Sequence, residues 1–92
     1  MPKITLEGHI IVPSADLESV KNELLNHIEL TRAEDGCVIF EVAQDSNNKN
    51  RFNVYEEFVD QKSFSLHQQR VGQSAWGNIT INVERHYQIT EE

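Results

Sequence analysis

The most constraining feature of this sequence is the order in which the spacing of its apolar residues changes along the chain. Residues 4–12 alternate between apolar and polar side chains, as in a strand with one buried face, and apolar residues within 17–28 then recur at helical spacing. Two further β-type runs, 37–43 and 52–59, precede a shorter helical stretch and a last alternating run over residues 79–89. This order predicts an α+β, ferredoxin-like βαββαβ fold with two helices on one face of an antiparallel sheet.

The ends of the expected elements carry suitable capping and turn residues. Ser14 and Asp60 are expected to cap the two helices, because their short side-chain oxygens can accept hydrogen bonds from amides of the first turn. Gly36 provides a break after the first helix, and the turn-forming segment 45–50 predicts an antiparallel hairpin between the runs on either side. The sequence contains no internal repeat, low-complexity tract or linker, so residues 1–92 are expected to form a single domain.

A sheet with both helices on one face leaves its other face open. In the run 37–43, Phe40 and Val42 lie on one side and Ile39 and Ala43 on the other, so we expect both sides of this strand to be covered. A chain of 92 residues is also near the lower limit for a stable core without help. We therefore expect a homodimer in which two copies pack sheet to sheet through the open face.

Composition argues against several classes of partner. The net charge of −7 repels phosphate backbones, so nucleic acid is not an expected partner. No apolar run approaches the ~20 residues that a membrane span needs, and the start of the chain lacks an export signal, so no membrane association is expected. Cys37 is the single cysteine, which excludes a disulfide within the chain and favours a cytoplasmic location.

Three segments of the chain resemble one protein family. They are E-x-G-C-x-x-F-E-V-x-Q-D at 34–45, R-F-x-x-Y-E-x-[WF]-x-D at 51–60 and F-x-x-H at 64–67. Over about residues 3–90 the sequence resembles the antibiotic biosynthesis monooxygenase (ABM) domain, which implies a dimeric α+β barrel. That family includes cofactor-independent oxygenases of polycyclic or quinol-type aromatics, haem-degrading enzymes and an isomerase of a phosphorylated autoinducer. Many members carry a second histidine five residues after the F-x-x-H histidine, where this chain has Gly72.

His67 is the first candidate for a catalytic role, because an imidazole can move a proton near neutral pH. The resemblance places it beside the cavity of the family, although a histidine there could also only bond the neighbouring strand. Trp76 could stack on a flat substrate, but a lone tryptophan in a small domain is more often part of the core. Together with Trp76, we expect Tyr55 and Phe64 to line the cavity between sheet and helices, and His9 is a further candidate for substrate contact.

A polar patch is expected on one face of the sheet. Side chains alternate between the two faces along a strand, and polar residues of three strands occupy the positions that point to the same face. Two histidines with carboxylates could hold a divalent metal, but the spacing is not a recognised metal signature and a hydrogen-bonded dimer interface explains it equally well. No metal site is therefore predicted. The residues of the patch are Glu7, His9, Tyr55, Glu57, Glu84 and His86.

The working hypothesis for function is a cofactor-independent monooxygenase. The sequence has no Gly-rich phosphate loop, dinucleotide fingerprint or nucleophile elbow, so no bound cofactor is predicted. The enzyme would oxidise a small aromatic, quinol or polyketide-like substrate with molecular oxygen, and His67 would assist deprotonation. One alternative is an isomerase of a phosphorylated autoinducer-type signal, with Arg51 and Arg70 as candidate cations. The other is a non-catalytic dimeric module that binds a small ligand.

Overall fold

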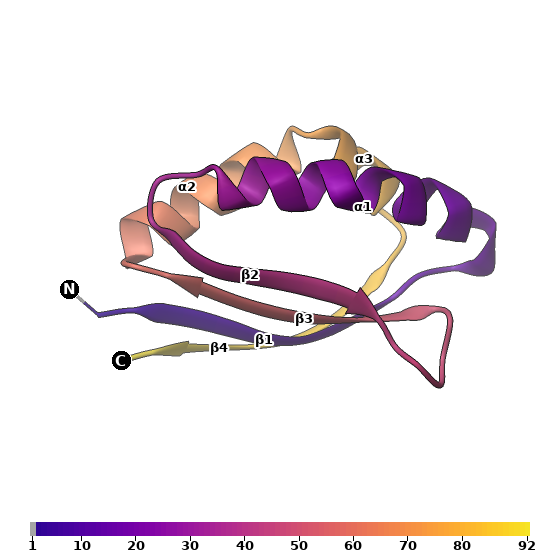
Figure 1. Cartoon of the computed structure of the whole chain (residues 1–92), viewed down its shortest axis with the longest axis horizontal. Coiled ribbons are helices and arrows are strands. Elements are labelled where there is room, and N and C mark those ends of the chain that lie inside the picture. The colour runs from indigo at the N-terminus through magenta and orange to yellow at the C-terminus, as the bar shows by residue number, and fades with distance from the viewer. Residues whose placement is uncertain (1) are drawn as a thin grey trace.

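The computed structural model describes residues 2–92 as one antiparallel sheet with helices on one side (Figure 1). The strand order is β2-β3-β1-β4, so the first strand is central and pairs with the third and the last. This is the α+β, ferredoxin-like fold that the order of apolar periods predicts. The elements are β1 (Ile4–Ile11), the 3-10 turn η1 (Ser14–Asp16), α1 (Leu17–Arg32), β2 (Cys37–Gln44), β3 (Arg51–Phe58), α2 (Gln61–Gly72), α3 (Ala75–Ile79) and β4 (Glu84–Glu91).

Two clusters of buried apolar residues join the sheet to the helices. Because side chains alternate along a strand, every second residue of β1 and β3 points toward the helices. These residues supply Ile10 and Phe52 of the first cluster and all of the second except Phe64. Apolar burial therefore attaches the helices to the same face of the sheet. The first cluster consists of Ile10, Val12, Val20, Phe52, Trp76 and Val83, and the second consists of Ile4, Leu6, Val54, Phe58 and Phe64.

One of the two predicted helix caps is present. The Asp60 carboxylate accepts a hydrogen bond from the backbone N–H of Ser63 at 2.8 Å and caps α2. The predicted cap at Ser14 is wrong, because a 3-10 turn precedes α1 and no side chain caps its start. The Ser14 hydroxyl instead accepts a hydrogen bond from the Asn50 amide, which also donates to the carbonyl of Val12 at 2.7 Å. The β2–β3 hairpin thus holds the chain that enters the first helix.

The last strand begins later than the sequence predicts. Residues 79–83 fit an alternating pattern, but α3 ends at Ile79 and β4 starts at Glu84. The Ser74 hydroxyl caps α3 by accepting a hydrogen bond from the N–H of Gly77, and the Thr80 hydroxyl donates to the carbonyl of Trp76 at 2.6 Å. Alternation over five residues does not distinguish a strand from a short capped helix and turn, and here the hydroxyl caps favour the helix.

The predicted polar patch forms on the face of the sheet that points away from the helices. His9 of β1 lies opposite His86 of β4, and their rings stack with centroids 4.7 Å apart. Tyr55 donates a hydrogen bond to Glu57, and Lys3 lies 3.1 Å from the same carboxylate. Polar and aromatic side chains on this face therefore contact one another, within a strand and between strands, without a ligand.

The strand β2 is an edge strand with one covered face. It pairs only with β3, and Phe40 is its one fully buried residue, whereas Val38 and Glu41 are exposed. The expectation that this strand is covered on both sides is therefore not met within a single chain. Pairing of the open face with a second copy stays a prediction.

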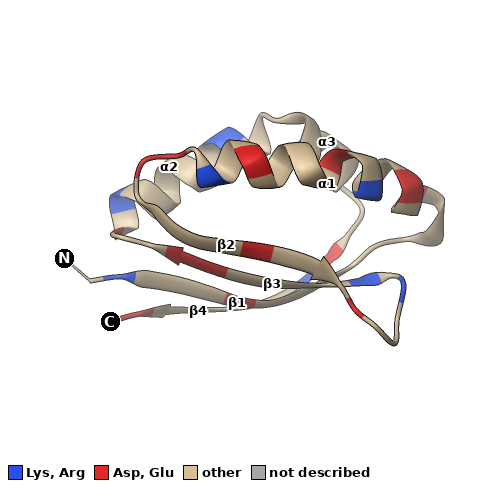
Figure 2. Cartoon of the chain, viewed as in Figure 1, with Lys and Arg blue, Asp and Glu red and all other residues tan. Residues whose placement is uncertain are grey.

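Charged residues are distributed over both layers of the molecule. Figure 2 shows Lys and Arg scattered over the helices, the sheet and the hairpin, with Asp and Glu between them. Within residues 2–92, none of the helices has the length and apolar character that crossing a bilayer requires.

The centre of β1 requires a glycine because β4 approaches it closely. Gly8 pairs with Val54 on one side and with Tyr87 on the other. A Cβ atom at position 8 would lie 1.9 Å from the backbone oxygen of His86. Neither the neighbouring backbone nor the paired strand can move away without breaking the ladder, so only glycine fits.

We expect Gly8→Ala to lower the free energy of unfolding by at least ~2 kcal/mol, because the methyl group collides with backbone atoms. Urea unfolding followed by circular dichroism measures this. The control is Gly72→Ala at the end of α2, where a Cβ has no atom within 4 Å and the change should be neutral or stabilising by up to ~1 kcal/mol. Equal losses in the two variants would contradict the steric explanation.

Candidate functional site

A cavity of about 190 Å³ lies between the sheet and the helices. Residues of both apolar clusters contribute to its wall, among them Leu6, Ile10 and Trp76. Ligand sites combine apolar walls with placed polar groups, and this cavity contains both kinds of residue. Its polar wall residues are His27, Glu56, His67, Gln68, Arg85 and Tyr87.

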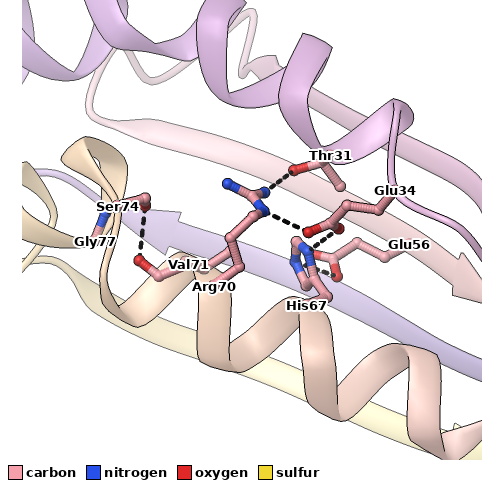
Figure 3. Close-up of polar contacts among 8 residues, drawn as sticks. All are labelled: Thr31, Glu34, Glu56, His67, Arg70, Val71, Ser74 and Gly77. Atoms are coloured by element: carbon pink, nitrogen blue, oxygen red, sulfur yellow. Dashed lines mark hydrogen bonds and ion pairs between the residues drawn. The ribbon is translucent and has the colours of Figure 1, made fainter.

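His67 lies between two carboxylates (Figure 3). Its Nδ1 is 2.7 Å from Oε1 of Glu34, and its Nε2 is 3.7 Å from Oε1 of Glu56. Arg70 donates one hydrogen bond to the other oxygen of Glu34 and one to the hydroxyl of Thr31, the latter at 3.0 Å. The Glu34 carboxylate thus bonds both Arg70 and the imidazole of α2, and Thr31 of α1 fixes the other end of the Arg70 guanidinium.

Local structure explains how these groups meet. Glu56 occupies the phase of β3 that points toward the helices, as Val54 does. His67 lies one helical turn after Phe64, so both face the sheet from α2, and Glu34 follows the end of α1. Each of the three segments that carry the family resemblance therefore supplies one member of the Glu34, His67 and Glu56 group.

Burial determines the protonation of Glu56. Loss of hydration raises the pKa of Glu56 to about 7, and the negative charge of Glu34 adds to this effect. Oε1 of Glu56 has no hydrogen-bond partner among the described residues. Burial also lowers the pKa of His67, although the bond to Glu34 opposes that shift. At neutral pH, Glu56 is therefore present both as carboxylic acid and as carboxylate, and it can take or give a proton.

A second buried histidine forms another part of the cavity wall. His27 of α1 is 4% exposed and stacks on Trp76 with ring centroids 4.5 Å apart and planes 3° from parallel. Its Nδ1 has no hydrogen-bond partner among the described residues, and burial lowers the pKa of His27 to about 3. His27 is consequently a neutral imidazole at physiological pH.

His27 and Glu56 are not among the predicted site residues, although both left a signal in the sequence. His27 falls on the apolar face of the first helix, at helical spacing from Val20 and Leu24. Glu56 interrupts the apolar phase of its strand between Val54 and Phe58. A polar residue in an apolar phase must be buried, which is the clue that was available in both cases.

The structure brings together only part of the expected cavity wall. His67 and Trp76 both line the cavity, and Trp76 is also part of the core. Tyr55 and His9 do not line it, because both point to the opposite face of the sheet. Phe64 packs edge-on against Phe58, with centroids 5.7 Å apart, and also lies outside the cavity. The wall also contains His27, Glu56 and Phe40, whereas the expected wall residues Tyr55 and Phe64 and the substrate-contact candidate His9 lie outside it.

A metal centre made by the protein was also considered. In the part of the chain that the structure describes, no three or more His, Cys, Asp or Glu side chains are grouped as metal ligands. His86 lies 3.4 Å from Glu84 of the same strand and stacks on His9 of the neighbouring strand, and side-chain packing on this sheet face explains both contacts.

Comparison with known proteins assigns the chain to a family. The sequence profile described as antibiotic biosynthesis monooxygenase matches residues 4–78, so the chain belongs to the antibiotic biosynthesis monooxygenase family. No curated protein matches the sequence significantly. The family assignment agrees with the resemblance carried by the three sequence segments.

Solved structures support the same fold. A Bacteroides thetaiotaomicron protein described as a possible oxidoreductase has a TM-score of 0.78 and 17% identity, covering 99% of this chain and 98% of that one. A Methanosarcina mazei protein has a TM-score of 0.71 and 22% identity, covering 100% and 92%. A structure described as an antibiotic biosynthesis monooxygenase has a TM-score of 0.71 and 15% identity, covering 100% and 96%. At such identities the likeness shows the fold alone.

The neutral state of His27 predicts a pH dependence of stability. The unfolded chain protonates His27 near its ordinary pKa of 6.5 and the folded chain only near 3, so this contribution to stability is present above pH 6.5 and lost on acidification. Between pH 7 and pH 5 the wild type should lose ~2 kcal/mol through this group, and His27→Gln should not. Urea unfolding at both pH values measures the difference. Parallel pH profiles of the two proteins would contradict a neutral buried His27.

Glu56 should have the opposite effect. Its folded-state pKa lies above its ordinary value of 4.5, so its contribution favours folding at low pH and is lost as the pH rises through about 7. From pH 5 to pH 7.5 the wild type should lose ~2 kcal/mol relative to Glu56→Gln, measured in the same way. Glu57→Gln, on the other face of β3, is the control and should follow the wild-type profile.

Proposed function

We propose that this chain is a cofactor-independent monooxygenase that oxidises a small aromatic or quinol substrate with molecular oxygen inside the cavity. The observation that carries the proposal is the pair of ionisable groups, Glu56 and His67, on the wall of one cavity between the sheet and the helices. Membership of the antibiotic biosynthesis monooxygenase family supports the same reaction class. A cytoplasmic location and a homodimer through the open sheet face are part of the proposal.

The size and walls of the cavity favour a substrate with one or two rings. A dry protein cavity of ~150 Å³ is sufficient to bind benzene. The cavity here is about 190 Å³, so a single-ring quinol fits and a large polycycle would require the walls to move. The flat faces of Phe40 and of the stacked His27 and Trp76 rings suit an aromatic ligand.

The reaction requires that a proton leave the substrate before oxygen reacts. A quinol anion can transfer electrons to O₂, so that quinol and O₂ give a hydroxylated quinone and water, with all four electrons from the substrate. A phenolic hydroxyl has a pKa of ~10, so its proton passes to a group of pKa about 7 at a cost of ~4 kcal/mol. Transfer to an ordinary carboxylate would cost ~7 to 8 kcal/mol. The raised pKa of Glu56 therefore favours deprotonation of the substrate.

The alternative isomerase is less well supported by the arrangement of cations. A phosphorylated ligand needs free positive charge in its site. Arg70 is bonded to Glu34 and Thr31, and Arg51 donates to Asn53 on the hairpin. Arg85 lines the cavity, but Glu56 shares that wall and would repel a phosphate whenever it is ionised. The non-catalytic binding module is the remaining alternative, and an activity assay distinguishes it.

Oxygen uptake with mass spectrometry of the products tests the proposal. One-ring quinols, two-ring naphthoquinols and three-ring anthrones would be offered without added cofactor. We expect uptake with the one-ring and two-ring compounds, and a loss of at least ~100-fold in His67→Ala, the scale of a lost acid–base group. His86→Ala, on the open face of the sheet, is the matched control and should retain activity. No uptake with any compound would refute the oxygenase and favour the binding module.

A further inference from the structure

We infer that Glu56 is the group that takes the proton from the substrate, and that His67 passes this proton on to Glu34 at the protein surface. The inference rests on the proposed oxygenase function and assigns the step to particular atoms. It changes the role of His67 from the proton acceptor for the substrate to the middle member of a relay. Glu34 becomes a positioning residue that also receives the proton.

The two carboxylates occupy opposite sides of the imidazole. Nδ1 of His67 bonds Glu34 at 2.7 Å, which leaves Nε2 directed toward Glu56 at 3.7 Å. The ring itself is only 3% exposed. Since ionised Glu34 accepts hydrogen bonds only, it selects the tautomer with the proton on Nδ1 and leaves Nε2 free to accept. A shift of less than 1 Å would bring Glu56 into hydrogen-bond distance of Nε2.

The relay leads from the cavity to solvent. Glu56 lines the cavity and is almost completely buried, whereas 18% of the Glu34 side chain is exposed. Arg70 holds the Glu34 carboxylate against the histidine and is itself held by the hydroxyl of Thr31, so the outer end of the relay has a defined position (Figure 3). A proton that enters at Glu56 can therefore reach the surface through Nε2 and Nδ1 of His67, once Glu56 closes the 3.7 Å gap to Nε2.

The proton count balances over the reaction. The substrate hydroxyl gives its proton to Glu56, Glu56 gives a proton to Nε2, and the Nδ1 proton leaves to Glu34 and water. No electron moves in this step. Because quinol and O₂ give a hydroxylated quinone and water without net proton release, the same path must return one proton for the water that forms. That return also restores the tautomer with the proton on Nδ1.

The other ionisable groups near Glu56 are compatible with this role. His27, which packs on the cavity from α1, stays neutral because burial lowers its pKa to about 3. Arg85 of β4 bonds the carbonyl of Thr80 at 3.2 Å, and Tyr87 of the same strand lines the cavity. Arg70 on α2 is bonded to Glu34, so its charge stabilises the outer carboxylate. Within the described chain, Glu56 is the carboxylate that lines the cavity.

Nuclear magnetic resonance of the ligand-free protein tests the relay without any assay of activity. Carboxyl ¹³C signals and imidazole ¹⁵N signals would be followed from pH 4 to pH 9. We expect His67 to carry its proton on Nδ1, and its Nε2 signal to change with the same midpoint, about 7, as the Glu56 carboxyl. Glu56→Gln should remove that midpoint from the His67 signal, and the control Glu57→Gln should retain it. A Glu56 midpoint near 4.5, or a His67 signal that Glu56→Gln does not change, would overturn the relay.

Kinetics then separate this inference from the proposed function. With an active quinol, Glu56→Gln should lower kcat/KM at least ~100-fold and abolish its rise with pH through about 7. Glu34→Gln, which cannot accept a proton, should lower kcat at least ~10-fold with KM nearly unchanged, and Glu34→Asp should restore part of it. Oxygen uptake that survives Glu56→Gln refutes the relay but not the oxygenase. If Glu56 and His67 titrate with one midpoint but no oxygen is consumed, the oxygenase is refuted and the Glu56–His67 proton pair is not.

Discussion

Burial of the Glu56 carboxyl is the constraint on which the site depends. Its place in β3 directs the side chain toward the helices, where lost hydration raises its pKa to about 7. An apolar residue of similar size there would be neutral or stabilising, since buried ionisable groups seldom add stability. The domain therefore tolerates the free-energy cost of burying the Glu56 carboxyl in its interior. The same burial gives this carboxyl the pKa that proton transfer near neutral pH requires.

The two buried histidines show how environment separates chemically identical groups. His67 has carboxylates on both sides and is suited to passing a proton. His27 is 6.4 Å from His67 between ring centroids, has an aromatic face against Trp76, and has no carboxylate bonded to it. Desolvation is the main cause that lowers the pKa of His27, and the charges of His67 and Arg70 add to it, whereas at His67 the bond to Glu34 opposes desolvation. One imidazole is thus part of the aromatic wall, and the other is part of the polar network.

Much of the fold could be predicted from the sequence, because each strand and helix repeats its apolar residues at its own period. The Asp60 cap and the polar face of the sheet also followed from local rules, as did the position of His67 beside the cavity from the family resemblance. The predicted helix cap at Ser14 and the predicted start of the last strand were wrong. Hydrogen bonds from the side chains of Asn50 and Thr80 decided those boundaries instead. Tyr55 was expected in the cavity although its own phase in the strand places it on the other face.

The sequence by itself determined the order of elements, the two faces of the sheet and the family, since these depend on residue spacing and on segments that are read locally. Only the tertiary structure decided which ionisable groups meet. Glu34, Glu56 and His67 are separated by 22 and 11 residues, and they lie in the turn after α1, on β3 and on α2. Their distances depend on how α1 and α2 pack on the sheet, and their pKa values depend on the water that this packing removes. No periodicity along the chain contains that information, because desolvation is a property of the assembled layers.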